Sequence, residues 1–214
     1  MGKMRLTFEK GEATRYVGHL DILRTFIRAL RRAEVPVKYS EGFNPHAIMT
    51  FALPLGVGVT SECELVDIAV SIELSPEIVI KNLNNSLQGG GIKILACECT
   101  DKPFGDIEKA EYYIKIKAEG KLDIDKIKKT LLQKEILVEK KSKKKTKEIN
   151  IMEHIFETEI VCFDDSSFIL RAVISAGNTF NIKPQLVASA IESATPGFAI
   201  KSIEPHRKRF IFIS

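Results

Sequence analysis

The chain has 214 residues, of which 44% are hydrophobic and 28% charged, and its formal net charge at pH 7 is +4. This composition is typical of a globular protein and differs from a disordered one. The apolar runs are far shorter than the roughly 20 residues of a membrane-spanning helix, and the N-terminus lacks the apolar segment of a signal peptide. We therefore expect a cytoplasmic protein with no membrane partner.

The first half of the chain alternates strand and helix patterns. Residues 4–8 alternate apolar and polar side chains, which is the period of a half-buried strand. A helix is expected at 18–33, because apolar side chains recur there at steps of three and four residues. The later elements of this half are expected to be strands at 47–53 and 64–73, a helix from the N-cap Ser75, and a strand at 92–99.

The same periodicities predict which side chains face the core. In the helix the expected apolar face consists of Leu20, Leu23, Ile27 and Leu30. In the strand at 64–73 the expected inward side chains are Val66, Ile68, Val70 and Ile72. Arginines occupy a stripe next to the apolar face of the helix, so this helix is expected to have one buried and one basic face.

The second half repeats this order of elements with one extra hairpin. We expect a strand at 111–118, a helix at 123–132 capped by Asp123, a strand pair around a lysine-rich turn, a hairpin over residues 164–167, a helix begun by Pro184, and a closing strand at 199–206 or 209–214. The order β-α-β-β-α-β appears twice, which predicts an α+β fold of two ferredoxin-like sandwiches in tandem. Turn residues at 100–106 place the boundary between domains 1–104 and 105–214.

The stretch "RYVGHLDILR" at residues 15–24 is the first candidate site. If the helix begins at Gly18, His19 lies in its first turn, where free backbone N–H groups and the positive end of the dipole favour an anion. Arg15 and Arg24 are expected to add charge-assisted hydrogen bonds, with Asp21 holding Arg24 in place. The alternative is that His19 is a hydrogen-bonded histidine at the edge of the core.

Further polar side chains extend this candidate site. Asn44 and His46 lie in an irregular loop that is expected to face the helix start, and the lysine-rich turn is expected to be mobile and to contribute charge. Basic side chains on the helix and in the turn could track a phosphate backbone. The candidate anion-binding or RNA-binding residues are Arg15, His19, Asp21, Arg24, Arg28, Arg31, Asn44, His46, Lys143, Lys144 and Lys145.

No metal ion or cofactor is expected. The four cysteines show no C-x-x-C spacing, so we interpret them as free thiols. His19, Asp21 and His46 are acceptable ligands but lack the spacing of a known metal motif. The lone "GVGVT" segment lacks the Gly-Lys-Ser/Thr ending of a phosphate loop.

Two sequence blocks, "GHLD" at 18–21 and "GFNPH" at 42–46, together with "ECELVDI", resemble an uncharacterised radical-SAM-associated protein family. Members of that family are found beside, or fused behind, radical SAM proteins, and the resemblance covers mainly residues 3–75. It implies a radical SAM protein as partner and a role in RNA modification or metabolism. The chain lacks the three-cysteine C-x-x-x-C-x-x-C motif, so it cannot perform radical SAM chemistry alone.

Three functions are compatible with these features. The first is an accessory protein that binds RNA or presents a substrate to a modification enzyme. The second is a metal-independent endoribonuclease with His19 as general acid or base, by fold-level analogy with CRISPR RNA-processing proteins that also pair two ferredoxin-like units. The third is a protein–protein adaptor that does not contact RNA.

Overall fold

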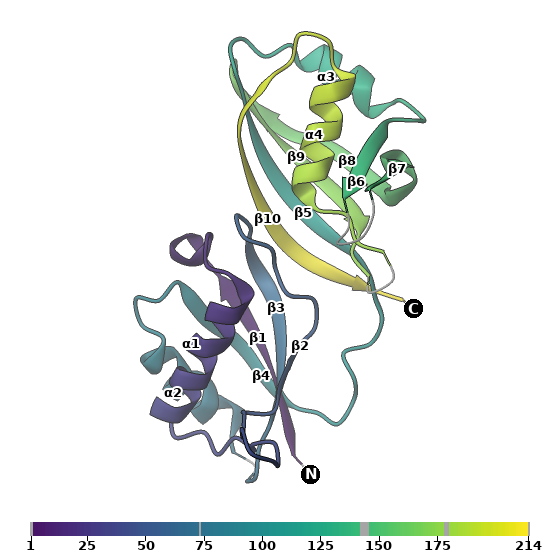
Figure 1. The fold of residues 1–214 in the computed structure, drawn as a ribbon. Helices are drawn as coiled ribbons and strands as arrows, with labels where there is room; N and C mark the ends of the chain where they lie inside the picture. The colour runs from purple at the N-terminus through teal and green to yellow at the C-terminus, as the bar shows by residue number, and fades with distance from the viewer. Residues whose placement is uncertain (1, 73, 142–145, 178–179, 214) are drawn as a thin grey trace. The chain divides into compact units, whose positions relative to one another are not determined.

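The computed structural model describes residues 2–72, 74–141, 146–177 and 180–213. The described chain is a mixed α+β fold with four α-helices and mainly antiparallel sheets, which confirms the α+β part of the prediction (Figure 1). It divides into two compact units, Met1–Gly105 and Asp106–Ser214. Among the described helices, none combines the length and apolar character needed to cross a membrane.

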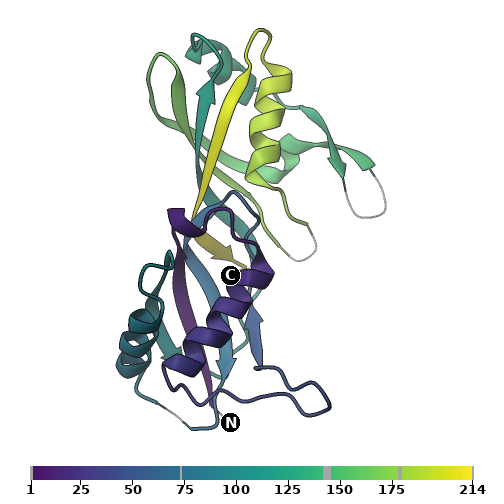
Figure 2. The same cartoon turned by 60° about the vertical axis from the view of Figure 1, so that its left-hand side comes forward.

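The first unit is one antiparallel sheet with two helices. Its elements are β1 (Lys3–Lys10), the short 3-10 helix η1 (Glu12–Thr14), α1 (His19–Arg32), β2 (Met49–Phe51), β3 (Thr60–Ala69), α2 (Pro76–Ser86) and β4 (Ile92–Cys99). The strands lie in the order β4-β1-β3-β2, and each neighbouring pair is antiparallel. Figure 2 shows α1 running alongside the strands of this sheet.

The core of the first unit lies between the sheet and both helices. Alternate side chains of β1 are fully or almost fully buried, because successive residues of a strand point to opposite faces. The side chains that meet them come from both helices, so α1 and α2 cover the same face of the sheet. The cluster includes Met4, Leu6 and Phe8 of β1, Ile22, Phe26 and Leu30 of α1, and Val79 and Leu83 of α2.

The side chains predicted to face the core were wrong in part for α1 and for β3. In α1 the buried side chains are Ile22, Phe26, Ala29 and Leu30, whereas Leu20 is 64% exposed. Apolar residues cover much of this helix, and the ring of Phe26, packed edge-on against Phe8 at 4.9 Å, fixes which face turns inward. Strand β3 ends at Ala69, so Ile72 lies beyond the sheet and is 65% exposed.

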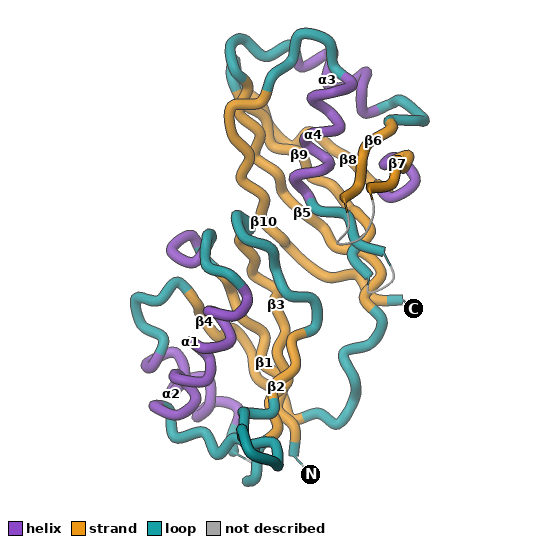
Figure 3. Tube along the Cα trace, in the orientation of Figure 1, coloured by secondary structure: helices purple, strands orange, loops and turns teal. Residues whose placement is uncertain are grey.

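The second unit repeats the strand order of the first. Its elements are β5 (Ile107–Ala118), α3 (Ile124–Leu131), β6 (Leu137–Lys141), β7 (Thr146–Asn150), the 3-10 helix η2 (Ile151–His154), β8 (Ile155–Phe163), β9 (Ser167–Ser175), α4 (Pro184–Ala194) and β10 (Ile200–Phe212). The strands of its sheet lie in the order β10-β5-β9-β8 and are antiparallel, while β6 and β7 form a separate hairpin (Figure 3).

Local signals placed most of these elements correctly. The side chain of Asp123 accepts a hydrogen bond from the backbone N–H of Lys126, as expected of an N-cap. The closing strand differs from the prediction, because β10 is continuous from Ile200 to Phe212 and covers most of both segments that were expected as alternatives. Pro205 lies inside this strand and is paired with Ile114 of β5.

Candidate functional site

Three arginines form an exposed basic stripe along α1. Arg24, Arg28 and Arg31 follow one another at steps of four and three residues, so they share one side of the helix. Arg24 makes an exposed ion pair with Asp21, at 2.9 Å. Arg28 and Arg31 have no hydrogen bond or ion pair within the described part of the chain. We call these three residues the arginine stripe; it offers two guanidinium groups to an anionic partner.

The start of α1 lies beside the core rather than on the arginine stripe. Gly18 is the N-cap, and its carbonyl accepts hydrogen bonds from the backbone N–H groups of Asp21 and Ile22. His19 is the first helical residue and is half-buried. Its ring lies edge-on to Phe51, with the ring centroids 4.9 Å apart. His19 is therefore packed on one side while it occupies a helix N-terminus.

His19 shares a small cavity with two buried charged residues that the sequence interpretation missed. The cavity has a volume of about 20 Å³, and Lys10 and Glu64 also line it. Lys10 is 2% exposed and Glu64 is 4% exposed. The Lys10 ammonium donates hydrogen bonds to the backbone carbonyls of Arg15 and Val59, each at 3.0 Å. Burying a charged group is costly unless it is hydrogen-bonded, and these two hydrogen bonds offset part of that cost for Lys10.

A signal for these two residues is present in the strand patterns. Lys10 continues the inward series of Met4, Leu6 and Phe8 along β1. Glu64 stands opposite Phe8 in the β1–β3 pairing, two residues before the buried Val66. A charged side chain at an inward position of each of two neighbouring strands therefore marks the end of the core beside α1.

The guanidinium of Arg15 is paired with the exposed carboxylate of Glu12. The residue is 7% exposed, and its guanidinium donates to both carboxylate oxygens of Glu12, at 2.8 and 2.5 Å. This paired geometry is the usual one between arginine and a carboxylate. An anion bound by Arg15, as predicted, would therefore compete with the Glu12 carboxylate for the same guanidinium N–H donors.

Asn44 and His46 do not lie beside His19. Their loop is closed by the bridge between Tyr39 and Ala47, and His46 Nδ1 lies 2.8 Å from the hydroxyl of Ser40. Lys38, at the start of this loop, donates its backbone N–H to Ala69 at the end of β3. Ala69 is five residues beyond Glu64, or about 17 Å along the strand. The structure thus separates His46 from the cavity that His19 lines, and the expected single pocket does not form.

Lys143, Lys144 and Lys145 lie outside the described residues. The lysine next to this turn in β6, Lys140, places its ammonium 3.3 Å from the centroid of the Phe180 ring. That ring stacks on His154 at a centroid distance of 3.8 Å. Burial lowers the pKa of Lys140, and burial also lowers the pKa of His154 although Glu153 opposes the change. The turn end of the β6–β7 hairpin is therefore packed against Phe180 through Lys140.

A family model described as "Uncharacterized protein conserved in bacteria (DUF2344)" matches residues 3–184. The chain is a member of this family. No curated protein sequence matches it.

Two solved structures are similar to this chain in fold. A "Cbf5-Nop10-Gar1 Complex" matches with a TM-score of 0.56 and 12% sequence identity, over 98% of this chain and 48% of that chain. An "H/ACA RNP bound to a substrate RNA containing 2'-deoxyuridine" matches with a TM-score of 0.50 and 13% identity, over 98% of this chain and 47% of that chain. The chain therefore spans about half the length of the chains it matches, and the likeness concerns the fold.

Proposed function

We propose that this protein is a radical-SAM-associated accessory protein that binds RNA, or presents an RNA substrate, through the arginine stripe of α1. The observation that carries the proposal is the position of Arg28 and Arg31, which are exposed on one side of a helix and have no partner in the described ranges. Guanidinium groups in such an arrangement suit the phosphate oxygens of a nucleic-acid backbone. Lys38 and the lysine-rich hairpin extend the basic character of the chain.

The structural comparisons support RNA as the class of partner. One of the similar structures contains a substrate RNA, and the likeness covers nearly the whole of this chain. At 13% identity the likeness carries over the fold but no individual binding residue. The binding residues are therefore proposed from the charges of this chain.

The proposed protein partner is a radical SAM enzyme. The support is the resemblance of residues 3–75, with the "GHLD" and "GFNPH" blocks, to a family found beside radical SAM proteins. Because this chain has no radical SAM cysteine motif, the partner would supply the chemistry and this chain the contact to RNA. In this proposal the chain itself binds no cofactor.

We also propose that the two units are independent ferredoxin-like domains in tandem. The support is the strand order, β4-β1-β3-β2 in the first unit and β10-β5-β9-β8 in the second, which interleaves two β-α-β motifs in each. Fragments ending at Gly105 and beginning at Asp106 are expected to show cooperative thermal unfolding and dispersed amide NMR spectra. A fragment that is unfolded alone would contradict the proposal for that unit.

RNA binding through the arginine stripe is tested by its dependence on salt. The double variant Arg28→Gln/Arg31→Gln should bind a single-stranded oligoribonucleotide more weakly than the wild type. Removing one phosphate-binding charge lowers the slope of log affinity against log salt by about 0.7, so removing two lowers it by about 1.4. The measurement is fluorescence anisotropy over a salt series.

A matched control removes the same charge elsewhere. Lys121→Gln/Lys129→Gln neutralises two exposed lysines of the second unit that have no partner in the described part of the chain. This variant should keep the wild-type slope. Equal losses of affinity in both double variants would show that net charge, rather than the arginine stripe, determines binding.

A further inference from the structure

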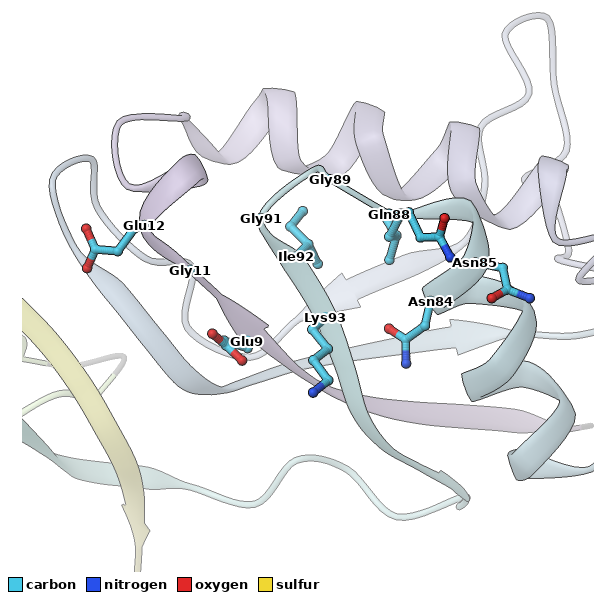
Figure 4. A pocket seen from close by; sticks show the side chains of 11 residues that line it. Glu9, Gly11, Glu12, Asn84, Asn85, Gln88, Gly89, Gly91, Ile92 and Lys93 are labelled. Atoms are coloured by element: carbon cyan, nitrogen blue, oxygen red, sulfur yellow. The ribbon is translucent and has the colours of Figure 1, made fainter.

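The hollow beside the start of β4, of about 510 Å³, does not gather its polar side chains around one point (Figure 4). Glu9 and Lys93 alternate with the inward side chains of β1 and β4, so they point away from α2. Asn85 and Gln88 lie at the end of α2, on the other side of the sheet, and Glu12 belongs to η1. These groups are spread over several elements and do not form one binding site.

The second sheet presents its polar side chains on a single face. The helices α3 and α4 contact each other and bury side chains against the sheet, and Figure 1 shows α4 lying along the strands. Alternate residues of β5 from Ala110 to Ala118 are buried on that side. Tyr113, Lys115 and Lys117 lie between them, so they point to the opposite face. We call this opposite face of the β10-β5-β9-β8 sheet the open face.

Tyr113 lies in the middle of a row across the open face. The strand register places His206 of β10 directly opposite it on one side and Arg171 of β9 directly opposite it on the other. Side chains in such positions have Cβ atoms about 5 Å apart. Arg171 is held by hydrogen bonds to Glu111, at 2.6 Å, and to Glu157, at 2.9 Å. A half-buried phenol ring is therefore flanked by two planar nitrogen-containing groups on the same face.

Two lysines continue from Tyr113 along β5. Residues two positions apart lie about 7 Å apart along a strand, so Tyr113, Lys115 and Lys117 form a line. Both lysines are exposed, and neither makes a hydrogen bond or ion pair within the described ranges. Glu204 stands opposite Lys115 but is engaged in another interaction. Three further carboxylates of the open face are paired with Arg171, namely those of Glu111, Glu157 and Glu159.

A ring beside a line of unpaired cations suits a single strand of RNA. Proteins bind single strands by stacking bases on aromatic side chains while basic side chains follow the backbone. A four-stranded sheet is one of the scaffolds that present aromatic rings to RNA in this way. Double-stranded RNA fits less well, because its bases are already stacked on one another and its recognition depends on shape.

We propose that the open face of the second sheet binds single-stranded RNA, with one base stacked on Tyr113 and neighbouring phosphates contacted by Lys115 and Lys117. His206 and Arg171 flank the stacked base. The inference deepens the proposed function and rests on it for the class of ligand. It adds a base-stacking position in the second unit to the arginine stripe of the first.

The test uses the tyrosine emission of the full chain, which contains four tyrosines and no tryptophan. Titration with a short unlabelled oligouridylate should quench part of this emission in the wild type, with free tyrosine as the control for light absorbed by the RNA. Tyr113→Phe keeps a ring that can stack, so it should bind a labelled oligouridylate within about twofold of wild type in anisotropy. The same variant should lose most of the quenching.

A second variant removes the ring itself. Tyr113→Leu should bind about tenfold more weakly than wild type, the effect of losing one stacked base. The matched control, Tyr39→Leu, makes the same change at an exposed tyrosine of the first unit and should keep both the affinity and the absolute loss of emission. The emission of the wild type and of Tyr113→Phe tests the site even if Tyr113→Leu does not fold.

The outcomes separate this site from the proposed function. Full quenching in Tyr113→Phe, or binding by folded Tyr113→Leu as tight as wild type, would overturn the site, and weak binding by Arg28→Gln/Arg31→Gln in the same assay would leave the proposed function standing. If the arginine variant binds and is quenched like the wild type while Tyr113→Leu binds weakly, the site stands and the arginine stripe fails. No binding of the oligouridylate by the wild type would overturn both.

Discussion

His19 illustrates how one residue can satisfy both a functional and a structural interpretation. It occupies a helix N-terminus, yet its ring packs edge-on against Phe51 and lines a cavity with Lys10 and Glu64. The arginine stripe lies on the exposed side of the same helix. The two features can therefore be separated by mutation.

We expect His19→Ala to lower the free energy of unfolding by about 1 kcal/mol, because the edge-to-face packing of its ring on Phe51 is removed. RNA affinity should stay within about twofold of wild type, because the arginine stripe binds the phosphates. Urea denaturation and an RNA titration on one preparation measure both quantities. Loss of RNA cleavage with intact binding would instead identify His19 as a general acid or base.

The residue types around the start of α1 were predictable, but their partners were not. The sequence indicated that His19, Arg15 and Asp21 lie near a helix start, because Gly18 marks where this helix begins. Lys10 and Glu64 join this group only through the pairing of β1 with β3, which brings together residues more than 50 positions apart. Each of the two charged side chains continues the inward pattern of its own strand, but the pairing that brings the two strands together leaves no mark on a single stretch of sequence.

At the scale of elements, Glu111 joins three strands of the second unit. Its carboxylate in β5 accepts a hydrogen bond from Arg171 of β9, at 2.6 Å, and another from Arg209 of β10. Glu111 is only 5% exposed. Burial alone would raise the pKa of this carboxyl, but the hydrogen bonds from the two arginines hold the pKa below its ordinary value.

This lowered pKa predicts a loss of stability in acid. A carboxyl whose pKa is lower in the folded than in the unfolded chain contributes stability above the unfolded pKa, and the contribution is lost as pH falls through the folded pKa. Glu111→Gln should lower stability at neutral pH by about 2 kcal/mol and flatten its decline below about pH 4.5. Urea denaturation over a pH series measures this, with the exposed Glu119→Gln as control. Parallel curves for Glu111→Gln and wild type would argue against the role of Glu111.

The order of elements was readable because each carries a local signal, such as Ser75 and Pro76 before α2 or Asp123 before α3. The side of each element that turns toward the core was harder to predict. Apolar side chains at Leu20, Leu23 and Ile27 gave α1 a plausible core face, but the packing of Phe26 against Phe8 turned a neighbouring face inward. A helix with a wide apolar surface leaves its orientation to its tertiary neighbours.

At the scale of the whole molecule, the recurrence of β-α-β-β-α-β indicated an α+β fold with two similar halves, and the two compact units have matching strand orders. The sequence did not indicate where the loop with Asn44 and His46 would lie. Its position follows from the bridge between Val37 and Val70 and from the hydrogen bond of Lys38 to Ala69, which again join distant segments of the chain.

The central claim is that the arginine stripe of α1 binds RNA, and its most direct test is crosslinking of the protein to RNA in cells, followed by sequencing of the bound RNA. The full-length wild type, Arg28→Gln/Arg31→Gln and the control Lys121→Gln/Lys129→Gln would be compared at equal expression. We predict that the wild type and the control recover the same defined set of RNA sites, and that the arginine variant loses most of that signal. Equal recovery by all three proteins, or no RNA above background with the wild type, would contradict the claim.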